Sequence, residues 1–129
     1  MANLTDEINN TLSSVISGAG DLVGTLRDVA KENVVKTVAG VGDVTSSGIN
    51  AVSDVVTSGV EALTQTGASV MDGVTGLVEG AVDGAKDAGV NATEAASEAA
   101  SAAIKSAHHL GGALGDVAIG AVSGAIKAA

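Results

Sequence analysis

The sequence contains no Cys, Pro, Phe, Trp or Tyr among its 129 residues. Without cysteine the chain has no disulfides, iron–sulfur clusters or thiolate zinc sites. Without aromatic rings it has no stacking surface for bases, and its 6 Lys and Arg are outnumbered by 15 Asp and Glu. Proteins that bind nucleic acid need basic surface and often use stacking side chains. We therefore expect no nucleic-acid partner.

No secretion signal is expected from the start of the sequence, and no long run of large apolar residues is present. Its first seven residues are polar and acidic, unlike the basic and then apolar start of a signal peptide. The nearest approach to a membrane span, residues 110–126, is interrupted by Asp116 and several glycines. These absences predict a cytoplasmic location, with export by a non-standard route left open.

The acidic residues that are present follow an eleven-residue repeat. Two of the eleven positions, the series that begin at Asp6 and Asp21, hold 13 of the 15 acids. The repeat runs through the chain without insertion or deletion. Eleven residues make three turns at about 3.67 residues per turn, close to the α-helical value. The spacing therefore predicts helix throughout.

The large aliphatic residues follow the same repeat and gather on one face of the predicted helix. Five neighbouring positions hold 30 of the 35 large aliphatic residues, on an arc of roughly 160°. A β-strand would not preserve this arrangement, because its two faces alternate with period two. The predicted assembly or surface-binding face comprises Ile8, Val38, Val41, Ile49, Val52, Val56, Val60, Leu63, Val74 and Val78.

The predicted fold is all-α, with long amphipathic helices in a single repeat-built region, residues 1–129. The helices are extended or folded as a helical hairpin, and ordered by self-assembly or by a surface, because the stretch rich in Val and Gly is a poor isolated helix. Bends are expected near residues 18–20, 40–42 and 111–112, where glycines cluster. The Ala-rich span from Asp87 to Ala107 should be the most autonomous helix.

Glycines four residues apart point to close contacts between helix backbones. Gly76, Gly80 and Gly84 form a GxxxGxxxG run, and the same spacing recurs in two pairs, Gly111/Gly115 and Gly120/Gly124. Small residues at this interval let two backbones approach each other. A chain with 18 glycines also produces such spacings by chance, so both interpretations stay open.

The repeat resembles known families of amphipathic-helix proteins. The segment GINAVSDVVTSGVEALTQTG, residues 48–67, is similar to the eleven-residue repeats of perilipins and synucleins, and TEAASEAASAAIKSA from Thr93 is similar to late-embryogenesis-abundant proteins. Bacterial phasins, which coat polyester granules, share the broad composition. The resemblance implies a helix that lies on an apolar surface or against other helices. Unlike the synuclein repeats, the polar face is acidic, which disfavours anionic membranes.

Few residues suggest chemistry. His108 and His109 are neighbours, and neighbouring residues on a helix point about 100° apart, so the pair cannot chelate one ion. Carboxylate pairs such as Asp83 and Asp87 would need a pocket for acid–base work, which a polar helix face does not offer. We predict no enzyme, no catalytic or metal site and no cofactor.

These features predict a structural protein whose amphipathic helices self-assemble into a filament, bundle or coat, with the chain itself as partner. The alternative is a perilipin-like or phasin-like coat on a neutral lipid or polyester surface, with the apolar arc on the surface and the acids in water. A third hypothesis is a stress or desiccation protectant. The mean hydropathy of +0.41 is high for that class, so it ranks last.

Overall fold

The structure is a computed structural model that describes residues 22–38, 44–66, 70–110 and 114–128. Within these ranges the prediction of an all-α chain is confirmed. The bends predicted near residues 18–20, 40–42 and 111–112 lie outside the described residues. The helices of the described part are α2 (Leu22–Val38), α3 (Val44–Thr66), α4 (Val70–Asp87), α5 (Ala92–Leu110) and α6 (Leu114–Ala128).

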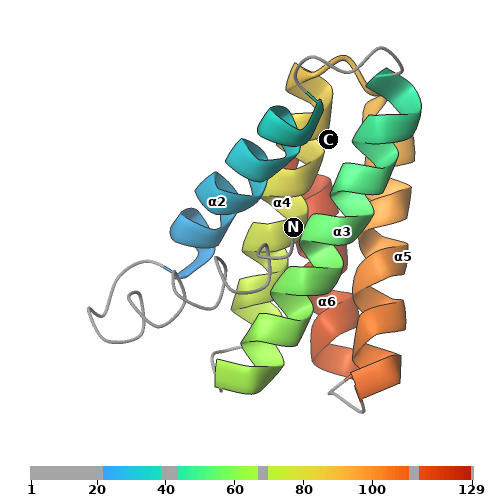
Figure 1. The fold of residues 1–129 in the computed structure, drawn as a ribbon. Helices are drawn as coiled ribbons and strands as arrows, with labels where there is room; N and C mark the ends of the chain where they lie inside the picture. The colour runs from blue at the N-terminus through green and yellow to red at the C-terminus, as the bar shows by residue number, and fades with distance from the viewer. Residues whose placement is uncertain (1–21, 39–43, 67–69, 111–113, 129) are drawn as a thin grey trace.

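The helices pack in two layers (Figure 1). Helices α2, α4 and α6 lie side by side and run in the same direction, whereas α3 and α5 run the opposite way in the second layer. Helix α4 is central, because it contacts all four of the other described helices. The described part of the chain is therefore neither extended nor a single hairpin. Its direction reverses at each successive helix, and its apolar faces meet one another.

Glycines bring the three parallel helices close together. Gly80 of α4 lies directly against the backbone carbonyl of Arg27 in α2. A Cβ added at Gly120 of α6 would stand 2.6 Å from the carbonyl oxygen of Met71, and one at Gly124 would stand 2.5 Å from that of Thr75. No side chain fits at such distances. Helix α4 is therefore held between α2 and α6 by backbone contacts that only glycine permits.

The core consists of aliphatic side chains, mainly Ala and Val, and its largest fully buried members are Leu26, Leu63 and Leu77. Two of these leucines pack across the contact between α3 and α4. Leu77 lies over Gly59, and Leu63 lies over Gly73. Each leucine thus fills the space that a glycine leaves on the opposite helix. Close approach of the helices compensates for the missing aromatic rings, because interiors need dense packing more than large side chains.

Residues 88–91 form a turn between α4 and α5. The prediction of one helix from Asp87 to Ala107 is therefore wrong at its start. Gly89 has a φ of 100°, a left-handed conformation that favours glycine. The amide of Val90 donates to the Ala85 carbonyl at 2.8 Å, and the amide of Gly89 donates to the Lys86 carbonyl at 3.0 Å. These two bonds form a Schellman motif that ends α4. The periodic pattern continues through this turn, so periodicity alone does not reveal it.

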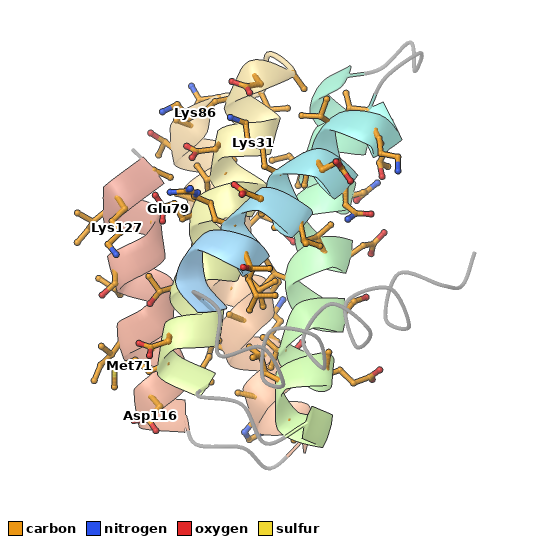
Figure 2. The ribbon with its side chains drawn as sticks, turned by 90° about the vertical axis from the view of Figure 1, so that its left-hand side faces the viewer. Lys31, Met71, Glu79, Lys86, Asp116 and Lys127 are labelled. Atoms are coloured by element: carbon orange, nitrogen blue, oxygen red, sulfur yellow. The ribbon has the colours of Figure 1, made fainter. Side chains whose placement is uncertain are left out.

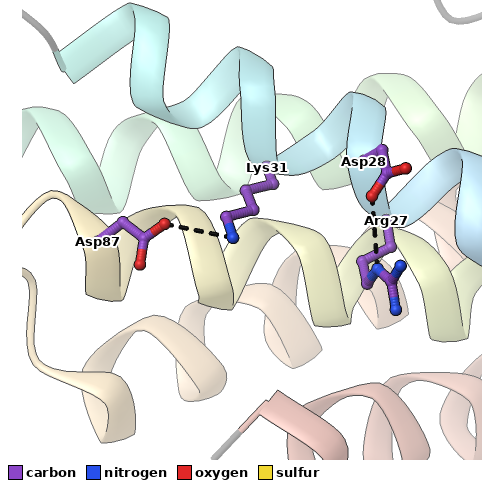
Figure 3. Close-up of polar contacts among 4 residues, drawn as sticks. All are labelled: Arg27, Asp28, Lys31 and Asp87. Atoms are coloured by element: carbon purple, nitrogen blue, oxygen red, sulfur yellow. Dashed lines mark ion pairs between the residues drawn. The ribbon is translucent and has the colours of Figure 1, made fainter.

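Polar contacts fix the outer helices to α4. The Lys31 ammonium of α2 lies 3.3 Å from the Asp87 carboxylate of α4 (Figure 3). At the end of α6, the ammonium of Lys86 donates to the carbonyl of Ala128 at 2.6 Å. A cation suits the last turn of a helix, where carbonyls lack partners within the helix. The exposed ion pair is worth little in free energy, so packing dominates.

Candidate interaction surface

The face that the sequence predicted for assembly lies mostly inside the described bundle. Ile8 and Val41 are outside the described residues, and Ile49 is partly buried. The other seven members are buried, with exposures of 4% or less: Val38, Val52, Val56, Val60, Leu63, Val74 and Val78. In this structure the helices of one chain cover these residues for one another, so the predicted face is not available to a partner while the bundle is closed.

A different apolar surface remains uncovered on α6. Ile119, Val122 and Ile126 are exposed by 54%, 55% and 70%, more than any other large aliphatic residue whose exposure the structure describes. Their spacing of three and four residues places them on one face of the helix. We call these three residues the α6 stripe.

The stripe faces outward because the opposite face of α6 packs against the bundle. Gly120 and Gly124 touch the backbone of α4, and Val117 and Ala121 are buried with exposures of 1% and 0%. On a helix these positions lie roughly opposite the stripe. The requirement for glycine against α4 therefore decides which side of α6 is buried.

Apolar surface continues from the stripe onto α5. Ala92, Thr93 and Ala96 of α5 line a shallow hollow together with Ala125 and Ile126 of α6. This hollow is mostly apolar, and no side chain of the described residues fills it. The stripe and the hollow share Ile126, so they form one continuous uncovered apolar region.

Two exposed charges of opposite sign flank the stripe. Asp116 lies in the first turn of α6 and Lys127 in its last turn, and Figure 2 places them near the two ends of the helix. They are eleven residues apart, about three turns, so they lie on the same side of the stripe. Within the described part of the chain, neither residue is in an ion pair.

A polar groove between α3 and α5 is a separate feature. It has a volume of about 260 Å³, and its lining includes Ser53, Thr57, Glu61, Glu98, Lys105 and Ser106. Ser106 is only 8% exposed. No imidazole lines this groove. A hydroxyl without a nearby base is a weak nucleophile, so the groove offers polar contacts rather than an evident catalytic pair.

The histidines and carboxylates that the sequence suggested as candidates for chemistry are dispersed over the bundle. His108 is exposed on α5, and the side chain of His109 is outside the described residues. Asp87 is paired with Lys31. Among the residues the structure describes, no three His, Asp or Glu side chains come close enough to hold a metal ion. None of the described helices has the length and hydropathy needed to cross a membrane.

The eleven-residue repeat does not predict the α6 stripe. The signal that does is the spacing of Gly120 and Gly124, because residues on the helix face opposite this pair are turned to solvent. No family model, curated protein or solved structure is significantly similar to this chain.

Proposed function

We propose that this protein is a non-enzymatic structural protein that self-associates through the α6 stripe. The observation that carries this proposal is the exposure of Ile119, Val122 and Ile126 on one face of one helix. Single exposed apolar side chains are ordinary, but a continuous apolar patch marks an interaction site. Covering such a patch is favourable by about 25 cal/mol for each Å² of apolar area removed from water.

The eleven-residue repeat supports the proposal that another helix packs against the exposed face of α6. Val122 occupies the same position of the repeat as Val34, Val56 and Val78, each of which is 0% exposed. In α2, α3 and α4 a neighbouring helix covers this position. In α6 the equivalent side chain is 55% exposed. A second copy of the chain supplies the covering helix that the repeat leads one to expect.

Paired variants test this proposal by sedimentation over a wide range of protein concentration. Wild type should associate as concentration rises. Ile126→Asp should weaken association at least tenfold, because it places an unpaired charge in the contact, at a cost of several kcal/mol. Val35→Asp is the control, since Val35 is an exposed aliphatic residue on α2, and it should change association less than twofold. Circular dichroism verifies that both variants fold.

Two results would overturn the proposal. One is a wild-type chain that stays monomeric at all concentrations. The other is an equal loss of association in the two variants, because a general effect of added charge would then explain the loss.

A coat on neutral lipid or polyester is the second candidate, and the stripe also supports it as a first point of contact. Opening the helices would join the stripe to the buried repeat residues in one long apolar face, as the resemblance to perilipins and phasins implies. A chain that is monomeric in buffer but floats with a neutral lipid emulsion, and loses flotation with Ile126→Asp, would favour this function over self-association.

A further inference from the structure

We propose that two copies pair through α6 in antiparallel orientation about a two-fold axis, with Asp116 of each copy beside Lys127 of the other. This inference rests on the proposed self-association and adds its geometry.

Asp116 and Lys127 lie about three turns apart on the same side of the stripe. An antiparallel two-fold pairing keeps this side of both helices together and reverses their direction. The acidic end of one helix then meets the basic end of the other, twice in the interface. A parallel two-fold pairing puts the charged sides of the two helices on opposite sides of the contact, so the charges do not meet. Charge complementarity therefore selects the antiparallel arrangement.

The opposite edge of the layer argues against a head-to-tail contact. The surface of α2 turned away from α4 carries the exposed charged residues Asp28, Glu32 and Lys36. Setting the apolar stripe of α6 against this surface would strip water from those charges, which is unfavourable. The most exposed large aliphatic side chains of the described bundle are those of the stripe itself, so a second stripe is the apolar surface that suits it best. A two-fold contact between the same surface of two copies forms a closed dimer.

The ion pairs also fix the register. When Asp116 is level with Lys127 of the second copy, the two-fold axis passes close to Val122. The two Val122 residues are then offset along the helices by about one residue, or about 1.5 Å. The two Ile126 residues are offset by about nine residues, or about 13 Å. Ile119 of one copy lies within about two residues of Ile126 of the other, an offset of about 3 Å.

The chain has no cysteine, so single cysteine variants report on this register without background. Disulfides form when Cα atoms are within about 7 Å. Under mild oxidation Val122→Cys should cross-link to itself at least tenfold faster than Ile126→Cys does. Ile119→Cys mixed with Ile126→Cys should form a heterodimer at least fivefold faster than Ile126→Cys forms a homodimer.

Charge-reversal variants provide a second, independent test of the antiparallel pairing. Asp116→Lys alone and Lys127→Asp alone should each weaken association about three- to tenfold, because like charges then meet. The double variant should return to within about twofold of wild type. The charges also suit the dipole of their own helix, and the double variant makes that interaction worse. Its thermal stability as a monomer should therefore fall while its association recovers, which separates the two effects.

The results distinguish failure of the geometry from failure of the function. If Ile126→Asp abolishes association but all three cysteine variants cross-link equally well to themselves, the pairing is parallel. The inference is then wrong while the proposed function stands. A double charge variant that associates more weakly than either single variant also overturns the inference. If wild type does not associate at all, the proposed function falls, and the inference falls with it.

Discussion

At the scale of single residues, glycine has two distinct roles in this molecule. Gly80 lies against the backbone of α2, with no space for a side chain, whereas Gly115 on α6 has nothing within 4 Å of an added Cβ. Both are helical glycines without positive φ. Glycine costs about 1 kcal/mol relative to alanine in a helix interior, and less at Gly115 in the first turn of α6, but only Gly80 gains a close contact in return.

Gly80→Ala should lower the free energy of unfolding by about 2 kcal/mol, because the added methyl group meets a backbone carbonyl that moves only if α2 moves. Gly115→Ala should raise it by about 0.5 kcal/mol through helix propensity. Urea denaturation followed by circular dichroism measures both values. Stabilisation by both substitutions would show that α2 and α4 do not pack as closely as described.

At the scale of elements, α5 begins with a side-chain cap. It is rich in Ala and Ser, and its buried side chains are small, among them Ala95, Ala99 and Ala103. Asn91 precedes it, and the side-chain oxygen of Asn91 accepts hydrogen bonds from the amides of Thr93 at 2.9 Å and Glu94 at 3.1 Å. These bonds satisfy amides that would otherwise lack partners at the start of the helix.

Asn91→Ala should therefore reduce the free energy of unfolding by about 1 kcal/mol. Thermal denaturation measures the change. Ser97→Ala, at an exposed position on the same helix, serves as control and should leave the stability unchanged or slightly higher. Equal effects of the two substitutions would contradict the capping role of Asn91.

The elements also show how far the sequence predicts this fold. The eleven-residue repeat predicts helix, and the described residues are helical outside the turn at 88–91. It does not predict that turn, because Gly89 is one of 18 glycines and the repeat passes through it unchanged. Nor does it predict the orientation of α6. The repeat would bury Val122, but the contact of Gly120 and Gly124 with α4 turns Val122 outward.

At the scale of the whole molecule, the described helices bury most of their large aliphatic side chains against one another. Among the described residues, the most exposed large aliphatic side chains are those of the α6 stripe, which belongs to a single helix. A standard interface buries about 800 Å² on each partner, and one helical stripe offers less. The net charge of −9 adds repulsion between copies. The proposed dimer should therefore be weak at low ionic strength and should strengthen in moderate salt, which screens the repulsion.

The most direct test of self-association through α6 is a dilution series followed by the methyl signals of isoleucine. The chain has 6 isoleucines, of which Ile119 and Ile126 lie in the stripe and Ile49 lies on α3, which does not contact α6. The proposal predicts that the Ile119 and Ile126 signals shift progressively with concentration while the Ile49 signal stays constant. Signals of Ile119 and Ile126 that do not change with concentration, or that shift no more than the Ile49 signal, would contradict it.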